Sequence, residues 1–377
     1  MNIKDLLTVM VKQKSSDLYI TVDSPPMFRT EGITNPYGET KLTANQVEEI
    51  ASSIMTEKQK IKFAETLEMN LALYYPELGR FRVNIFKQKG YTCLVIRQIK
   101  IDIKTIDDWK LPPILKEISL CKRGLVLVVG RTGTGKSTTL AAMIDYRNVN
   151  ATGHIISIED PIEFIHRHKK MIVSQRELGI DTYSFANALR NATRAAPDVI
   201  LVGEIRDIET METVITFAET GHLVLATLHA NNANQAMERI LNFFPHERHE
   251  QILLQLSLNL KAIISQRLLP SNDEIRAAAI EILLDTPRVK DLISKNQVET
   301  LKDAMAQGTV EGMQTFDQAI FDLYKQGRIN YDNTLAYADS VNDLRLKIKL
   351  DKLDDEKAVE ASETKARDKF RIRPDTK

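Results

Sequence analysis

Hydrophobic and polar positions give the first hundred residues a mixed pattern. Stretches with apolar side chains three or four residues apart alternate with short runs in which every second residue is apolar. This pattern predicts a small α+β domain. Its expected helices cover residues 2–14, 44–55 and 57–64, and its expected strands cover 17–22, 27–30, 68–75, 80–87 and 91–99.

The pattern changes after residue 115. Uniformly apolar runs, typical of parallel strands buried on both faces, alternate with helices and predict strands over 125–129, 154–158, 199–202, 223–228 and 278–284. Apolar positions within 247–269 keep a period of 3.6 and predict one long helix. We therefore expect an α/β protein with a first domain over 1–100, a linker over 101–115, a second domain over 116–345 and a charged, disordered tail over 346–377.

Composition narrows the classes of function. Apolar residues make up 43% of the 377 residues and charged residues 27%, which is ordinary for a soluble globular protein. The formal net charge is zero, which argues against nucleic-acid binding driven by overall charge. Two cysteines, Cys93 and Cys121, suit a reducing compartment and cannot supply a four-cysteine zinc site. We see neither an apolar signal peptide nor a run long enough to cross a membrane, so work at a membrane would be that of a peripheral partner.

A glycine-rich motif, G-x-x-x-x-G-K-S, follows the apolar run 125–129 and precedes a predicted helix. Strand, glycine loop and helix together predict a phosphate site, because successive backbone N–H groups and the helix N-terminus attract anions. Lys136 can reach the β- and γ-phosphates of a nucleotide, and the Ser137 hydroxyl can hold Mg²⁺. The expected nucleotide-binding residues are Gly130, Arg131, Thr132, Gly133, Thr134, Gly135, Lys136, Ser137 and Thr138.

Two acidic segments follow predicted strands. The strand that starts near Asp198 ends at Glu204, whose carboxylate could hold Mg²⁺ or polarise a water molecule; a solvated strand-end acid is the plain alternative. Glu159, Asp160 and Glu163 place three carboxylates within five residues, and these repel one another unless they are solvated, protonated or beside a cation. One of them could accept a proton from water, and an ordinary acidic turn is again the alternative.

Histidines and arginines add further candidates. His222 and His229 stand at the two ends of one predicted strand, too far apart to bind zinc together without other residues. A histidine near a γ-phosphate can donate to a phosphate oxygen, whereas His222 also fits a structural role. Arg80 and Arg82 share one face of the strand 80–87. They could be solvated, which the residues alone favour, or could clamp the nucleotide of another subunit.

In combination, these stretches resemble the secretion-type ATPases of the type II secretion and type IV pilus superfamily. The glycine loop resembles the Walker A motif of that family, and residues 158–164, 198–207 and 220–229 resemble its Asp box, Walker B motif and His box. Residues 16–20, 25–27 and 80–84 resemble the pilus retraction branch, the PilT/PilU family. The resemblance runs from about residue 3 to residue 350 and is highly specific in combination.

Within that branch the chain resembles the accessory PilU type. It has no C-x-x-C pair, and its N-terminal region is short for the extra leading domain of assembly ATPases. Residues 287–295 stand where PilT carries an Ala-Ile-Arg-Asn-Leu-Ile-Arg-Glu motif and depart from that motif. Residues 312–318 and the charged tail also look like the accessory type. The departure puts autonomous retraction in doubt, because the motif is tied to retraction in PilT.

The resemblance implies a PAS-like first domain and a RecA-like P-loop ATPase domain, joined by a flexible linker in a homohexameric ring. It implies Mg²⁺-dependent ATP hydrolysis that powers or assists pilus retraction, and with it twitching motility and DNA uptake. The implied partners are PilT and the inner-membrane platform protein, with the ring in the cytoplasm at the pilus base. The resemblance implies Glu163 as the catalytic glutamate and His229 as the γ-phosphate sensor. It implies Glu204 as the Walker B carboxylate, and Glu204 and Ser137 as the metal ligands. The arginines that it implies to act in trans are Arg80, Arg82 and Arg97, with Arg190 and Arg194 as weaker candidates.

Two other functions compete with that hypothesis. The chain could be a nucleotide-gated scaffold that supports PilT with little hydrolysis of its own. It could also be a pilus assembly ATPase, against which the missing cysteine pairs and the short N-terminal region argue.

Overall fold

The structure is a computed structural model that describes residues 2–99, 102–272, 276–351 and 353. Its first sheet has six strands in the order β3-β2-β1-β6-β5-β4, and the paired neighbours run antiparallel. The strands are β1 (Asp17–Ile20), β2 (Met27–Thr30), β3 (Ile33–Pro36), β4 (Glu68–Tyr75), β5 (Gly79–Gln88) and β6 (Tyr91–Gln98). The helices of this region are α1 (Ile3–Lys12), α2 (Ala44–Ile54) and α3 (Glu57–Thr66).

Alternation along the strands and helices builds the core of this first region. β5 alternates buried and half-buried residues, so Phe81, Val83 and Ile85 point inward while Arg80 and Arg82 lie on the opposite face. Thr43 and Thr56 cap α2 and α3 through reciprocal hydrogen bonds with the glutamines three residues on. The predicted α+β character and the three strands over 68–99 are therefore present in the structure, whereas β3 was not predicted.

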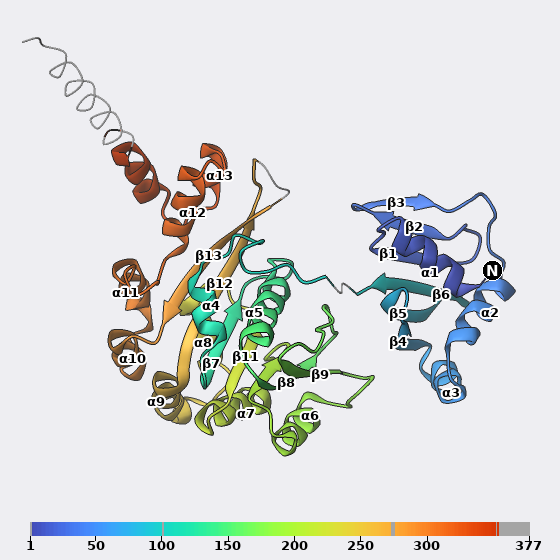
Figure 1. The fold of residues 1–377 in the computed structure, drawn as a ribbon, viewed down its shortest axis with the longest axis horizontal. Helices are drawn as coiled ribbons and strands as arrows, with labels where there is room; N and C mark the ends of the chain where they lie inside the picture. Colours follow the sequence, from blue (N-terminus) through green and yellow to red (C-terminus); the bar gives the residue numbers. More distant parts are fainter. Residues whose placement is uncertain (1, 100–101, 273–275, 352, 354–377) are drawn as a thin grey trace, which may run out of the picture. The chain divides into compact units, whose positions relative to one another are not determined.

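The second sheet has seven strands in the order β13-β12-β7-β11-β10-β8-β9 (Figure 1). Strand pairing is parallel for β12–β7, β11–β10, β10–β8 and β8–β9, and antiparallel for β12–β13. The strands are β7 (Gly124–Val129), β8 (Gly153–Glu159), β9 (Met171–Glu177), β10 (Val199–Val202), β11 (Leu223–Leu228), β12 (Leu260–Leu269) and β13 (Ala277–Leu284). The mixed α/β fold with a mainly parallel sheet agrees with the expectation.

Helices alternate with these strands along the chain. They are α4 (Ile114–Ser119), α5 (Lys136–Asn150), α6 (Phe185–Ala192), α7 (Ile208–Glu219), α8 (Ala233–Leu241), α9 (His249–Asn259), α10 (Pro287–Ser294), α11 (Leu301–Gln307), α12 (Phe316–Lys325) and α13 (Tyr331–Ala336). The described residues form two compact units, one drawn from residues 1–124 with 137–226 and the other from residues 125–136 with 227–377.

Several expectations about the second part of the chain differ from the structure. The single helix over 247–269 is wrong: α9 ends at Asn259, and residues 260–269 form β12, a strand buried between β7 and β13. An unbroken apolar run with adjacent Ile263 and Ile264 fits a strand covered on both faces as well as a helix, and strand pairing decides between the two. β9 was not predicted, because its sequence is half polar. In the expected linker, helix α4 begins at Ile114.

The charged tail also differs at its start. Residues 341–351 are helical, and Leu344 and Ile348, one turn apart, are buried in a cluster with Phe316 and Ile320 of α12. Residues 352 and 354–377 of the predicted tail lie outside the described residues. In the described part of the chain, no helix has the length and apolarity that crossing a bilayer requires.

Arg147 anchors helix α5 from within the protein. Its side chain is buried, and its Nη1 donates to the carbonyl oxygens of Ser119 at 2.8 Å and Cys121 at 2.7 Å. Ser119 is the last residue of α4 and Cys121 lies two residues after it, so these bonds hold α5 against the end of α4. Neither cysteine forms a disulfide; Cys93 is buried and Cys121 is partly exposed.

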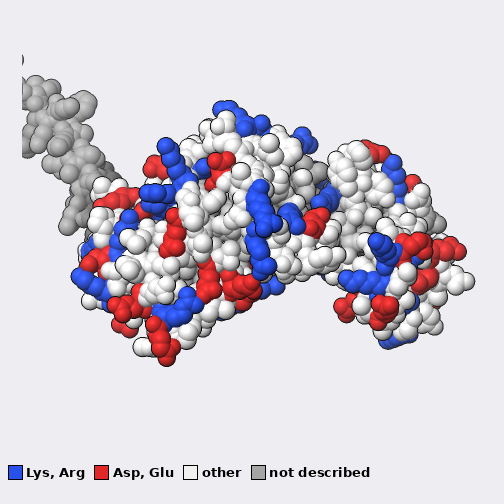
Figure 2. All heavy atoms as spheres, turned by 90° about the horizontal axis from the view of Figure 1, so that it is seen from below, with Lys and Arg blue, Asp and Glu red and all other residues white. Residues whose placement is uncertain are grey.

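Over the face in Figure 2, lysines and arginines lie among aspartates and glutamates, in keeping with the zero net charge.

Candidate functional site

The predicted phosphate loop has the geometry that its motif implies. Every residue of β7 is buried, and the loop after it runs from Gly130 to the start of α5 at Lys136. A Cβ atom on Gly130 would lie 2.5 Å from Thr134 Oγ1 and 2.7 Å from the Gln266 carbonyl oxygen, so only glycine fits there. Gly135 has φ +90°, a conformation that favours glycine. The loop is therefore a tight turn that ends at a helix N-terminus, as anion binding requires.

Side chains of the loop close it upon itself. Lys136 Nζ donates to the carbonyl oxygens of Gly130 at 2.8 Å and Arg131 at 3.1 Å, and Thr134 Oγ1 donates to the Arg131 carbonyl at 2.8 Å. Residues 131–133 are exposed and residues 134–138 are half-buried. The lysine ammonium is thus held at an accessible loop, and these residues fit a nucleotide phosphate as a ligand.

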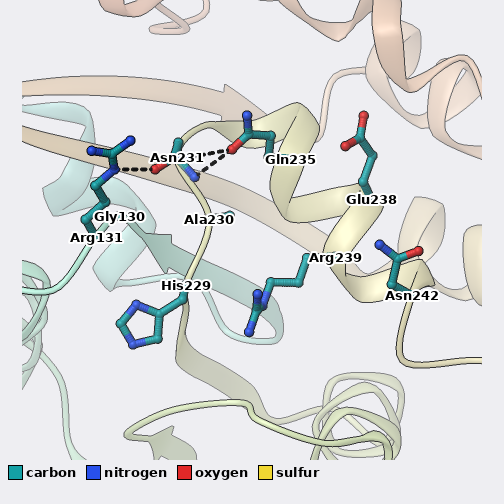
Figure 3. Close-up of a pocket in the computed structure, with 9 residues that line it drawn as sticks. All are labelled: Gly130, Arg131, His229, Ala230, Asn231, Gln235, Glu238, Arg239 and Asn242. Atoms are coloured by element: carbon teal, nitrogen blue, oxygen red, sulfur yellow. Dashed lines mark hydrogen bonds between the residues drawn. The ribbon is translucent and has the colours of Figure 1, made fainter.

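A polar cavity of about 310 Å³ lies beside this loop and contains the predicted residues Gly130, Arg131 and His229. Figure 3 shows a row of hydrogen bonds among its lining residues: Arg131 Nε donates to Asn231 Oδ1 at 2.9 Å, and Asn231 Nδ2 donates to Gln235 Oε1 at 2.8 Å. The other lining residues are Ala230, Glu238, Arg239 and Asn242. The structure therefore brings His229 and the phosphate loop to one cavity.

A buried carboxylate supports the segment that follows His229. Glu281 of β13 is 1% exposed, and its Oε1 accepts hydrogen bonds from the Ala233 backbone N–H at 2.8 Å and from Ser265 Oγ at 2.9 Å. Burial raises the pKa of Glu281, and these two hydrogen bonds oppose the rise. Since Ala233 is the first residue of α8, Glu281 fixes the beginning of that helix.

The acidic segment after β8 contains carboxylates in different surroundings. Glu159 Oε1 accepts from Ser157 Oγ at 2.6 Å and from Gln175 Nε2 at 3.2 Å, and burial raises the Glu159 pKa. Glu163 is exposed. Glu163 thus has access to solvent, while Glu159 is engaged with its own strand and with β9.

Glu204 lies two residues after β10. Its Oε2 accepts from Arg206 Nη2 at 2.6 Å, and Arg206 Nη1 lies 3.2 Å from Asp160 Oδ2. Arg206 therefore links the segment after β10 to the acidic segment after β8. The backbone also joins these two segments closely at Gly203, because the Gly203 N–H donates to the Ile158 carbonyl oxygen at 2.8 Å.

The predicted arginines lie on one face of the first sheet. Arg82 of β5 is directly opposite Arg97 of β6, and Arg97 Nε donates to Asp17 Oδ1 at 2.8 Å. Arg80 Nη2 lies 3.2 Å from Glu177 Oε2. Burial raises the Glu177 pKa, and the charges of Arg80 and Arg82 oppose this. The structure therefore pairs two of the three arginines with carboxylates.

The remaining predicted residues have plainer surroundings. His222 Nδ1 lies 3.2 Å from the Phe217 carbonyl oxygen, which fits the structural role considered for it. Arg190 is exposed and lies 4.0 Å from Glu209.

Each main candidate follows the carboxyl end of a parallel strand: the glycine loop follows β7, Glu163 follows β8, Glu204 follows β10 and His229 follows β11. Ligands bind at such ends in α/β sheets.

Sequence reasoning missed several polar residues around these segments. They are Gln175, Arg206, Asn231, Gln266 and Glu281. A usable signal existed for two of them, because Gln266 interrupts an apolar run and Glu281 stands alone among six apolar residues. Such buried polar side chains need partners and therefore mark a specific contact.

Comparison with known proteins gives the class of the chain. Residues 3–368 match the family described as Type II/IV secretion system protein, and the chain belongs to this family. It is 55% identical over 351 residues to the type IV pilus ATPase PilU of Pseudomonas aeruginosa, covering 93% of this chain and 92% of that protein. It is 42% identical to the type IV pilus retraction ATPase PilT of the same organism, over 88% of this chain and 97% of that protein.

A solved structure supports the same relationship. The crystal structure of the pilus retraction motor PilT with bound ADP superposes with a TM-score of 0.85 at 39% identity, covering 92% of this chain and 99% of that one. The chain is thus a close homologue of PilU and PilT, as the sequence motifs indicated.

Proposed function

We propose that this protein is an ATPase of the type IV pilus machine that powers or assists pilus retraction together with PilT. The observation that carries the proposal is the phosphate loop: a buried strand, a turn that admits only glycine at Gly130, and a helix that begins at Lys136. The homology to PilU and PilT supports the pilus as the machine on which it acts.

The roles of the residues follow from their chemistry. Backbone N–H groups of the loop and the Lys136 ammonium bind the phosphates of ATP. Ser137 and Glu204 supply oxygen ligands of the kind that Mg²⁺ prefers, and the bound ion would neutralise phosphate charge. Glu163 accepts a proton from the attacking water, for which its exposure suits it. His229 senses the γ-phosphate from the cavity that it shares with Arg131.

The assembly belongs to the same proposal. We infer a PAS-like domain over 1–100, a linker over 101–115 and a RecA-like domain over 116–345, arranged as a homohexameric ring. Arg80, Arg82 and Arg97 then act in trans on the nucleotide of a neighbouring subunit. The ring works in the cytoplasm at the pilus base, beside the inner-membrane platform protein and PilT.

A biochemical experiment tests the chemistry. Lys136→Ala should abolish hydrolysis and weaken nucleotide binding, because it removes positive charge from the β- and γ-phosphates. Glu163→Gln should retain ATP binding and lose turnover, because the amide keeps the shape and not the basicity. Lys122→Ala, which changes an exposed lysine outside the loop, is the matched control. Sustained turnover by Glu163→Gln would exclude this glutamate as the sole base.

A cellular experiment separates motor from scaffold. Helix α10 (Pro287–Ser294) carries the altered segment, and its buried side chains are Val289 and Ile293. We expect poor retraction of labelled pili in cells without PilT. Cells with an assembled, hydrolysis-dead PilT should retract when this protein is active and fail with its Lys136→Ala form. Strong retraction without PilT would show an autonomous motor, and full support by Lys136→Ala would favour the scaffold.

A further inference from the structure

One glutamine side chain holds both ends of the segment that carries Glu163. Gln175 is a half-buried residue of β9, opposite Ser157 of β8 in the parallel ladder. The segment leaves β8 at Glu159 and passes through Glu163 before the chain reaches β9 at Met171. A fixed amide on the neighbouring strand is therefore well placed to shape this connection.

The Gln175 side chain uses its carbonyl oxygen as an acceptor and its NH₂ group as a donor to two partners in this segment. Its Oε1 accepts from the His166 backbone N–H at 2.8 Å. Its Nε2 donates to the Phe164 carbonyl oxygen at 2.8 Å and to Glu159 Oε1 at 3.2 Å. These partners stand on both sides of Glu163 in the sequence, so a single side chain fixes the residues before and after it.

Burial around Glu163 agrees with that arrangement. Ile162 is 1% exposed and His166 is 8% exposed, whereas Glu163 between them is exposed. The backbone on either side is anchored inside the protein while the Glu163 side chain extends outward. A carboxylate that must meet a water molecule beside a phosphate needs such a fixed origin, because a misplacement of about 1 Å can cost about 100-fold in rate.

We propose that Gln175 is a positioning residue for Glu163, which rests on the proposed role of Glu163 as the base. Only an amide combines an acceptor for the His166 N–H with donors for the Phe164 carbonyl and the Glu159 carboxylate. A carboxylate at position 175 would face the Phe164 carbonyl and Glu159 without a proton to donate. An apolar side chain of the same length would leave all three partners without this bond.

The test compares Gln175→Glu and Gln175→Met with Gln59→Glu in the full-length protein. Gln59 Oε1 only accepts hydrogen bonds, from Thr56, so a glutamate there keeps the contact and controls for the chemical change. Both Gln175 variants should lose about 100-fold in kcat, while the Kd for ADP stays within about twofold of the unchanged protein. Amide exchange at His166 should become faster in Gln175→Met.

A double variant shows whether Gln175 acts through Glu163. Adding Gln175→Met to Glu163→Gln should cause no further loss of kcat, because the positioned group is already gone. If Gln175→Met keeps the wild-type kcat while Glu163→Gln is inactive, the positioning role of Gln175 is wrong and the role of Glu163 as the base stands. Loss of ADP binding in both Gln175 variants would also overturn it, since Gln175 would then support the fold as a whole. Normal turnover by Glu163→Gln would instead overturn the base assignment and, with it, this inference.

Discussion

Gly203 offers a sharp test of how the Walker B segment is built. It lies between the end of β10 and Glu204. A Cβ atom at this position would lie 3.1 Å from both the Glu159 Cα and the Ile158 carbonyl oxygen, and 3.6 Å from the Asp160 backbone nitrogen. The φ angle of Gly203 is outside the left-handed region, so alanine meets a problem of space and not of backbone conformation.

Two effects of Gly203→Ala oppose each other. Reduced freedom of the unfolded chain stabilises the variant by about 0.4–1 kcal/mol. Crowding a packed site costs about 1–3 kcal/mol, and here the neighbours are backbone atoms of β8 and the residue after it, which cannot rotate away. The net expectation is a loss of about 1–2 kcal/mol in unfolding free energy. For a domain of this size, that loss lowers Tm by about 2–8 °C.

Scanning calorimetry at fixed protein concentration measures the change, and steady-state hydrolysis tests the role proposed for Glu204. Gly308→Ala is the comparison, because the nearest atom to its added methyl belongs to the flexible end of Met313 and one backbone atom, the Ala304 carbonyl oxygen, lies 3.2 Å away, against two backbone atoms at 3.1 Å for Gly203. We expect Gly308→Ala to cost less. An unchanged or higher Tm for Gly203→Ala, or an equal loss for Gly308→Ala, would refute the reasoning.

Three further predictions concern charge and assembly. Burial lowers the His166 pKa from 6.5 to about 4, so the free energy of unfolding falls by about 3 kcal/mol as the pH drops from 6.5 to about 4. His166→Leu should reduce this pH dependence, measured by urea unfolding at a series of pH values. Burial raises the Glu281 pKa, so stability falls as pH rises above the ordinary carboxyl range, and Glu281→Gln should show a smaller fall in Tm over that rise in pH. If Arg82 acts in trans, mixed rings of Arg82→Ala and Glu163→Gln subunits should regain hydrolysis; inactive rings of confirmed mixed composition would contradict this.

Local signals predicted the elements that depend on neighbours in sequence. The buried run of β7, the glycine loop and the start of α5 follow one another directly along the chain, so pattern and motif suffice. The prediction for β12 was wrong because that strand depends on neighbours that are distant in sequence. Its apolar side chains fit a helical period, and only its pairing with β7 and β13 makes it a strand.

The candidate site shows the same division. Glu163, Glu204 and His229 belong to motifs that end predicted strands, so the sequence points to them directly. Gln175 lies on β9 and Gln266 on β12, strands that the pattern did not predict. Their importance comes from sheet register, which places Gln175 beside the Glu163 segment and the Gln266 carbonyl against Gly130. Single-sequence periodicity does not carry that register.

The buried Arg147 has a practical consequence for spectroscopy. It ties the Cys121 carbonyl to α5, whose first residue is Lys136, so about 16 Å of continuous helix separates the phosphate loop from this anchor. Cys93 is buried and Cys121 is partly exposed, so a maleimide dye reacts first at Cys121. The native sequence thus provides, without an introduced cysteine, a labelling position at the far end of the helix that begins in the phosphate loop.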